Sequence, residues 1–99
     1  MKARLSREAL SEIEEAERYY ESKRLGLGGE FVTEVGQMLE RIAVQPRSFP
    51  FFDRIADIRI ATLQRFPYRL PFILMADGIR ILAVAHTSRR PGYWRRRNM

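Results

Sequence analysis

The spacing of apolar residues changes midway along this chain of 99 residues. Between residues 6 and 45, apolar side chains recur every three or four positions, which is the period of an amphipathic helix. Between residues 57 and 85 they alternate with polar ones or form a short continuous run, as strands do. Helices followed by strands indicate an α+β fold, because each kind of element must bury its apolar side against the other.

Two helices are expected in the first half of the chain. The first follows Ser6, a good N-cap residue, and ends near Lys23 and Arg24, whose charges suit the negative end of a helix. Its glutamates fill the positions between the apolar residues, so we interpret them as a solvated outer face. The second helix carries an apolar stripe and is stopped by Pro46. The stripe consists of Phe31, Val35, Met38, Leu39 and Ile42. A turn containing Gly26, Gly28 and Gly29 would pair the two helices antiparallel.

Four strands are expected, at residues 2–5, 57–64, 66–75 and 79–85. Asp77-Gly78 predicts a hairpin between the last two. Pro71 cannot donate to a ladder, so it predicts an edge, a bulge or a shifted register. Residues 46–56 read as a connector whose phenylalanines pin it onto the core, and Pro91 is a candidate first residue of a short terminal helix.

The expected order is therefore β-α-α-β-β-β in one domain over residues 1–99. An N-terminal strand and a two-helix hairpin pack on an antiparallel sheet, and a short basic tail follows. A mass of 11.7 kDa leaves room for one core and is too small for a doubly wound nucleotide-binding fold.

Several classes of chemistry are disfavoured by composition. The chain has no cysteine and a single histidine, His86, so we expect no disulfide, no metal site and no cofactor. Its start is too polar for a signal peptide and its longest apolar run is too short to span a membrane. We therefore expect a cytoplasmic protein with no membrane partner.

Charge is distributed unequally between the two halves. Residues 1–53 carry 8 Lys and Arg against 10 Asp and Glu, whereas residues 54–99 carry 10 arginines against 2 aspartates. The guanidinium fork suits phosphates and carboxylates, which predicts a polyanionic partner, either nucleic acid or an acidic protein segment. The alternative is a surface that serves solubility alone.

Arginines and aromatic residues are interleaved on the expected strands and tail. The candidate residues for binding a target or partner are Arg59, Arg65, Tyr68, Arg80, His86, Arg90, Trp94 and Arg95. We expect the arginines to converge in one exposed concavity beneath the helices, where they would hold phosphates while rings stack on bases. The alternative is that Tyr68 and Trp94 complete the core and that the terminal arginines are disordered.

RNA cleavage is one chemical possibility. A base would activate the 2′-hydroxyl, an acid would protonate the leaving oxygen, and cations would stabilise the phosphate. His86 and Tyr93 are the candidates for proton transfer, and Arg69 and Arg89 for charge stabilisation. A structural role for His86 at the end of an apolar strand is the competing interpretation.

Three segments together resemble one known group of proteins. Arg65-Phe-Pro-Tyr-Arg69, Asp77-Gly-Ile-Arg-Ile-Leu-Ala-Val-Ala-His86 and Arg89-Arg-Pro-Gly-Tyr-Trp94 are similar to segments of the RelE/ParE superfamily of bacterial toxins. The resemblance implies a small α+β toxin held inactive by a cognate antitoxin in a hetero-oligomer. RelE-like members cut messenger RNA on the ribosome, whereas ParE-like members poison DNA gyrase.

This sequence matches only some of the residues of the RelE-type site. Arg69 after Tyr68 matches, and Arg89 (or Arg90) and Tyr93 match after an insertion. Arg59 also matches, but Ala61 stands where a second basic residue is expected. The two-helix hairpin and the tail look more ParE-like, which favours a gyrase inhibitor. A ribosome-dependent endoribonuclease using Arg69, Arg89 and Tyr93 is the alternative, and a relative without toxicity is a third.

Overall fold

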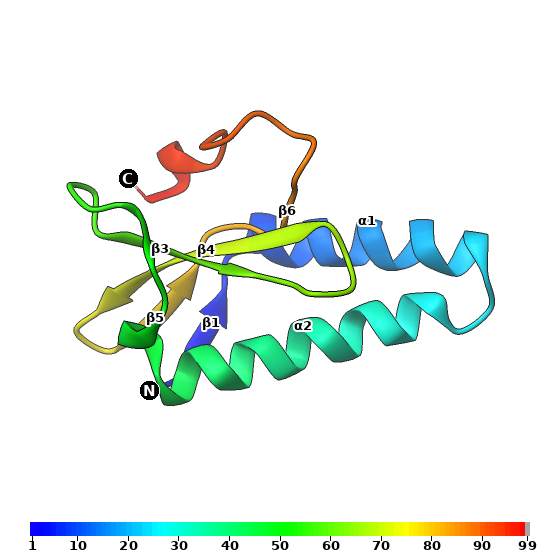
Figure 1. Cartoon of the computed structure of the whole chain (residues 1–99), viewed down its shortest axis with the longest axis horizontal. Coiled ribbons are helices and arrows are strands. Elements are labelled where there is room, and N and C mark those ends of the chain that lie inside the picture. The colour runs from blue at the N-terminus through cyan, green and yellow to red at the C-terminus, as the bar shows by residue number, and fades with distance from the viewer. Residues whose placement is uncertain (99) are drawn as a thin grey trace.

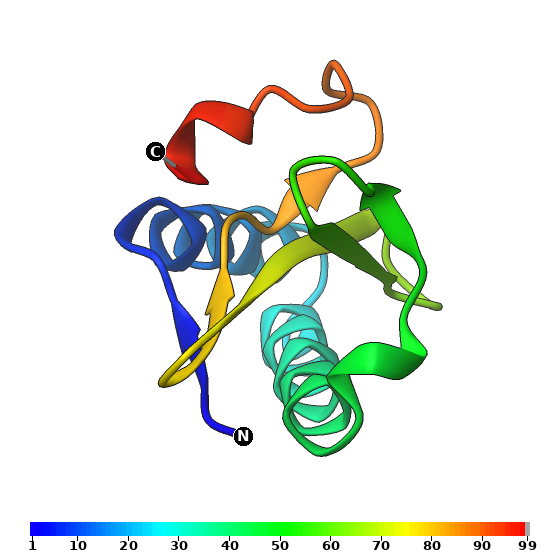
Figure 2. The same cartoon turned by 90° about the vertical axis from the view of Figure 1, so that its left-hand side faces the viewer.

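Two helices cover one face of a six-stranded sheet, and the C-terminal segment lies against the sheet from the side away from α2 (Figures 1 and 2). The computed structural model describes residues 1–98. The helices are α1 (Arg7–Lys23) and α2 (Leu27–Val44), with short 3-10 helices at Pro46–Ser48 and Arg95–Asn98. The strands are β1 (Ala3–Leu5), β2 (Phe51–Asp53), β3 (Ile58–Thr62), β4 (Tyr68–Met75), β5 (Gly78–Ile81) and β6 (Ala85–His86). The expected α+β class, with its N-terminal strand and helical hairpin, is confirmed.

The sheet has the strand order β1-β5-β4-β3-β2, and β6 also pairs with β4. Only the β1–β5 pair is parallel among the strand pairs that the structure describes. The helical hairpin between β1 and β2 takes the chain from one edge of the sheet to the other, and β2 to β5 then lead back to β1. A long connection of this kind is what a parallel pair of strands requires.

Side chains hold both the start of α1 and the turn between the two helices, where glycine is also required. Ser6 caps α1, because its Oγ accepts the N–H of Ala9 at 3.1 Å. Gly26 occupies the left-handed region with φ 89°, which favours glycine. Glu21 accepts the N–H groups of Gly26 and Gly28 at 2.8 and 3.0 Å. Gly28 and Gly29 lie inside α2, so the prediction that all three glycines form the turn is wrong.

The sheet separates two clusters of buried side chains. Alternation along β4 directs Tyr68, Leu70, Phe72 and Leu74 toward the helices. Ile73 faces the other way and packs with Trp94 of the C-terminal segment. The tail is therefore part of the folded core, and Tyr68 and Trp94 are both buried, with 8% and 3% of their surface exposed.

The predicted strand at residues 79–85 is interrupted. β5 ends at Ile81 and β6 begins at Ala85, and Leu82, Ala83 and Val84 lie between them, all buried. Phe72 pairs with Ile81, and Arg69 pairs with Ala85. The three residues between Ile81 and Ala85 therefore lie opposite only two residues of β4, Leu70 and Pro71, which is a bulge. Pro71 is one of those two, and its carbonyl accepts the N–H of Leu82. Of the edge, bulge or shifted register that Pro71 predicts, the structure shows the bulge, and the missing N–H of Pro71 faces the point where the ladder is broken.

Two segments differ from expectation. The connector contains a strand, β2, because Phe51 and Asp53 pair with β3 across a local irregularity. Pro91 does not begin a helix: residues 91–94 form turns, and a 3-10 helix starts at Arg95.

In the described part of the chain, no helix combines the length and the apolar character that crossing a membrane requires.

Candidate functional site

Glu12 of α1 joins three parts of the chain through one carboxylate. Its Oε1 accepts the N–H of Val84, from the segment between β5 and β6, at 3.0 Å. Both oxygens accept hydrogen bonds from the guanidinium group of Arg97, at 3.0 and 3.2 Å. Its Oε2 also accepts the hydroxyl of Tyr93 at 2.6 Å and a nitrogen of Arg89 at 3.5 Å. These donors surround a carboxylate that is only 16% exposed, and hydrogen bonds that involve charged groups are the stronger kind.

Tyr93 lies between charged groups. The guanidinium carbons of Arg89 and Arg97 are 3.7 and 5.2 Å from the centre of its ring, which is favourable for cation–π contact. Arg97 also donates to the carbonyl of Leu82 at 3.2 Å. The pKa of Arg97 is raised: its partial burial acts to lower it, but the hydrogen bonds to Glu12 outweigh that effect.

A pocket of about 300 Å³ opens beside this cluster. It is lined by Glu12, Glu15, Ala16, Tyr19, Tyr68, Val84, His86, Arg89 and Tyr93. Four residues proposed from the sequence therefore meet in one place: Tyr68, His86, Arg89 and Tyr93. Tyr68 and His86 are cross-strand partners with ring centres 5.1 Å apart, and Nδ1 of His86 accepts the N–H of Ser88 at 3.0 Å.

The pocket is poorly equipped for proton transfer by tyrosine. Burial, together with the hydrogen bond to Glu12, raises the pKa of Tyr93 to about 12, despite the opposing charges of Arg89 and Arg97. Burial is also the main cause that raises the pKa of Tyr68. Both hydroxyls therefore stay protonated near neutral pH. Arg69 does not line the pocket, because alternation along β4 sends it to the face opposite Tyr68.

The expected convergence of arginines into one concavity is wrong. Arg89 and Arg97 pair with Glu12, whereas Arg95 pairs with Asp53 beside the ring of Phe52. The hydrogen bond from Ala56 and the pairing with Arg95 lower the pKa of Asp53. Arg95 and Arg97 lie in the same 3-10 helix, yet they pair with different carboxylates.

Three further candidate arginines lie on β3, on β5 and in the segment after β6. Arg59 of β3 donates to the carbonyls of Arg47 and Phe49 and lies over the ring of Phe51. Arg80 of β5 is the register partner of Arg4 on β1. Arg90 is exposed in the segment after β6.

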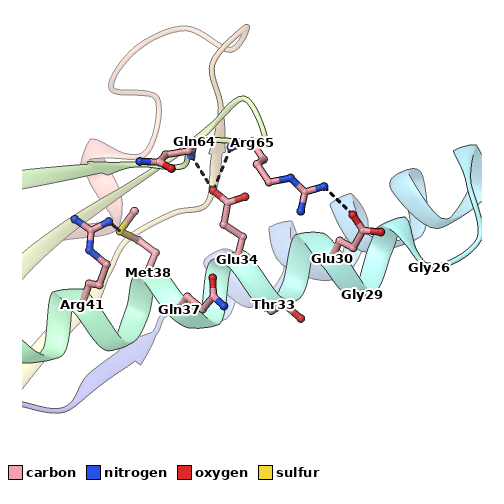
Figure 3. A pocket seen from close by; sticks show the side chains of 10 residues that line it. All are labelled: Gly26, Gly29, Glu30, Thr33, Glu34, Gln37, Met38, Arg41, Gln64 and Arg65. Atoms are coloured by element: carbon pink, nitrogen blue, oxygen red, sulfur yellow. Dashed lines mark hydrogen bonds and ion pairs between the residues drawn. The ribbon is translucent and has the colours of Figure 1, made fainter.

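A second hollow, of about 610 Å³, runs along α2 beneath the β3–β4 turn (Figure 3). Glu34 accepts the backbone N–H groups of Gln64 and Arg65 at 2.7 and 3.2 Å, and Glu30 binds the guanidinium of Arg65 at 2.7 Å. Hydrogen bonds from Arg65 and Arg24 lower the pKa of Glu30. Arg65, a predicted binding residue, is thus used to fasten the turn to the helix.

Glu12 is a pocket residue that is absent from the candidates proposed from the sequence. The pattern of glutamates predicts a solvated helix face for it, yet it lies three residues after Ala9 and four before Ala16, both of which are buried. That spacing places it on the buried side of α1. What it meets there comes from residues more than 70 positions away, so its partners could not be inferred locally.

No group of three or more His, Cys, Asp or Glu side chains is arranged to hold a metal ion within residues 1–98.

Comparison with known proteins places the chain among relatives. The matching family is described as "ParE toxin of type II toxin-antitoxin system, parDE", and the match covers residues 3–91. A similar solved structure is described as "Chromosomal ParDE TA system from P. aeruginosa". It is 20% identical with a TM-score of 0.65, and the alignment covers 87% of this chain and 95% of that one, which is a likeness of fold. No curated protein matches the sequence.

Proposed function

Since this chain belongs to the ParE toxin family of type II toxin–antitoxin systems, we propose that it inhibits DNA gyrase by protein–protein contact and is neutralised by a cognate antitoxin. Membership of this family confirms the ParE-like resemblance, and the toxin–antitoxin role follows from it. The target and the mode of neutralisation are the proposed part.

The observation that carries the proposal is the state of the residues expected to cut RNA. Tyr93 donates its hydroxyl to Glu12, Arg89 pairs with the same carboxylate, and Arg69 lies on the other face of the sheet. A base and a phosphate clamp for RNA cleavage would have to meet around one phosphorus atom. This arrangement supports a toxin that acts by contact rather than by catalysis.

The positive charge of the C-terminal segment supports contact with both proposed partners, gyrase and an antitoxin. Arg90 and Arg96 are exposed on the C-terminal segment, and no ion pair involves them within residues 1–98. Such arginines are available for carboxylates on a partner protein, where their main contributions are to association rate and specificity. An antitoxin segment with acidic residues would compete for them.

A supercoiling assay tests the proposal. Purified toxin added to gyrase, relaxed plasmid and ATP is expected to inhibit supercoiling, and equimolar antitoxin is expected to restore it. Arg90→Ala should weaken inhibition, whereas Arg18→Ala, an exposed arginine on α1, serves as the matched loss of charge. Unchanged supercoiling at a large excess of toxin would contradict the proposal.

One observation favours the second candidate, an endoribonuclease: His86, Arg89 and Tyr93 do share a pocket. Toxin would be mixed with translating ribosomes and the ends of the message mapped. New ends at the A site that are lost in His86→Ala or Arg69→Ala would support cleavage. Full cleavage by Arg69→Ala would remove Arg69 from the mechanism.

A further inference from the structure

We infer that Glu12 positions the C-terminal segment, residues 89–97, against α1 and the sheet, and that loss of the Glu12 carboxylate would release this segment from its docked place. The inference deepens the proposed function in one respect, because the docked segment presents the exposed arginines proposed to meet the target. Docking itself is a property of the free toxin and is measured without any target.

Ion pairs attach this segment to the rest of the protein, in addition to the burial of Trp94. Within residues 1–98, two carboxylates pair with its arginines, Glu12 and Asp53. The Asp53–Arg95 pair is largely open to water, since Arg95 is 52% exposed. The Glu12–Arg97 pair is more enclosed, with both side chains below one-fifth exposed, and an enclosed bidentate pair is the stronger kind.

Glu12 also offsets repulsion within the segment. Arg89, Arg95, Arg96 and Arg97 all carry positive charge, and the first and last of them approach the same ring, Tyr93. The Glu12 carboxylate accepts from Arg89, Tyr93 and Arg97 together, so it closes the segment into a loop against α1. Without its negative charge, two guanidinium groups would remain close to each other with no counter-ion.

Release would uncover an apolar surface. Trp94 packs against the ring of Phe52 at 4.9 Å between ring centres and against Ile58, Leu82 and Ala83 on the sheet. Trp94 is 3% exposed and is the single tryptophan of the chain. Its fluorescence therefore reports directly whether the segment is docked.

Glu12→Gln tests the inference, with Glu14→Gln as the matched variant, because Glu14 is an exposed neighbour on α1 with the same charge. In Glu12→Gln we expect Trp94 emission to shift to longer wavelength and acrylamide quenching to increase. The amide hydrogens of Arg95 and Arg97, which bond to Gly92 and Trp94, should exchange at least about tenfold faster. Glu14→Gln should match the wild type. Unchanged quenching and exchange in Glu12→Gln would overturn the inference.

Arg97→Lys is a second, milder variant that keeps the charge but loses the two-pronged geometry. It is expected to release Trp94 partially. The mobility gained in the double variant Glu12→Gln with Arg97→Gln should be less than the sum of the gains in the two single variants, because both substitutions break the same Glu12–Arg97 pair. Additive effects of the two substitutions would contradict the inference even if Glu12→Gln lowered global stability.

The supercoiling assay separates this inference from the proposed function. Glu12→Gln should inhibit gyrase at least about tenfold less than wild type, while still forming a complex with the antitoxin. A wild type that fails to inhibit gyrase would contradict the proposed function, and the fluorescence of Trp94 would still decide the role of Glu12. A Glu12→Gln variant with released Trp94 and full inhibition would overturn the link between docking and target contact.

Discussion

Ser6 joins two distant parts of the chain through one hydroxyl group. Its Oγ accepts the N–H of Ala9 and donates to the carbonyl of Leu82 at 3.2 Å, and the residue is buried. Ser6→Ala should lower the free energy of unfolding by about 2 kcal/mol, because it removes an N-cap and leaves a buried carbonyl with one partner fewer. Urea denaturation measures this. Ser11→Ala, at an exposed position of α1, should change stability by less than about 0.5 kcal/mol, and equal losses in both variants would refute the capping argument.

Tyr93 makes stability depend on alkaline pH. Its pKa in the folded protein is about 12, above the ordinary value of 10.0, because burial and the bond to Glu12 favour the protonated hydroxyl. The stabilisation is therefore fully present below about pH 10 and is lost as the pH rises toward 12. Unfolding by urea at pH 8 and pH 11 should show this decline. Tyr93→Phe should have a shallower decline, with the remainder due to Tyr68, and an unchanged slope would contradict the assignment.

At the scale of elements, the contact between α1 and α2 depends on glycine at one position. A Cβ atom on Gly28 would lie 2.6 Å from the backbone carbonyl of Glu17, whereas one on Gly29 would meet nothing within 4 Å. Gly28→Ala should therefore push the helices apart and cost about 1–3 kcal/mol. Gly29→Ala should be neutral or stabilising by up to about 1 kcal/mol, since alanine favours helix. Thermal unfolding of the two variants provides the comparison, and equal effects would exclude the proposed steric contact.

Sequence pattern predicted the element types well and their ends less well. The helical period located both helices, and alternation located β3 and β4, because both patterns are set by which side of an element is buried. The apolar run at residues 79–85 predicted one strand, but its residues serve two layers. Leu82 and Ala83 pack with the tail, whereas Ile81 and Val84 pack toward the helices, and periodicity does not reveal such a change of side.

At the scale of the whole molecule, the two apolar clusters share the strands that lie between them. Helices cover one side and the tail covers the other, so loss of the sheet would disrupt both. We therefore predict that residues 1–99 unfold as one cooperative unit. Trp94 fluorescence should report the tail side, and far-UV circular dichroism should report the helices. Their denaturation curves should coincide, and separate midpoints would show that the tail unfolds independently.

The amino-acid sequence by itself determined the alternation of element types, the cap at Ser6, a glycine break between the helices, an irregularity of the sheet at Pro71 and the relation to ParE-like toxins. These features depend on neighbouring residues, whose geometry follows from local periodicity and backbone sterics. Tertiary structure decided where the charges go. Glu12 meets Arg97 across 85 positions and Arg65 meets Glu30 across 35, and electrostatic partners are chosen by distance in space. For that reason arginines that look like one basic surface in the sequence are divided among separate carboxylates in the folded protein.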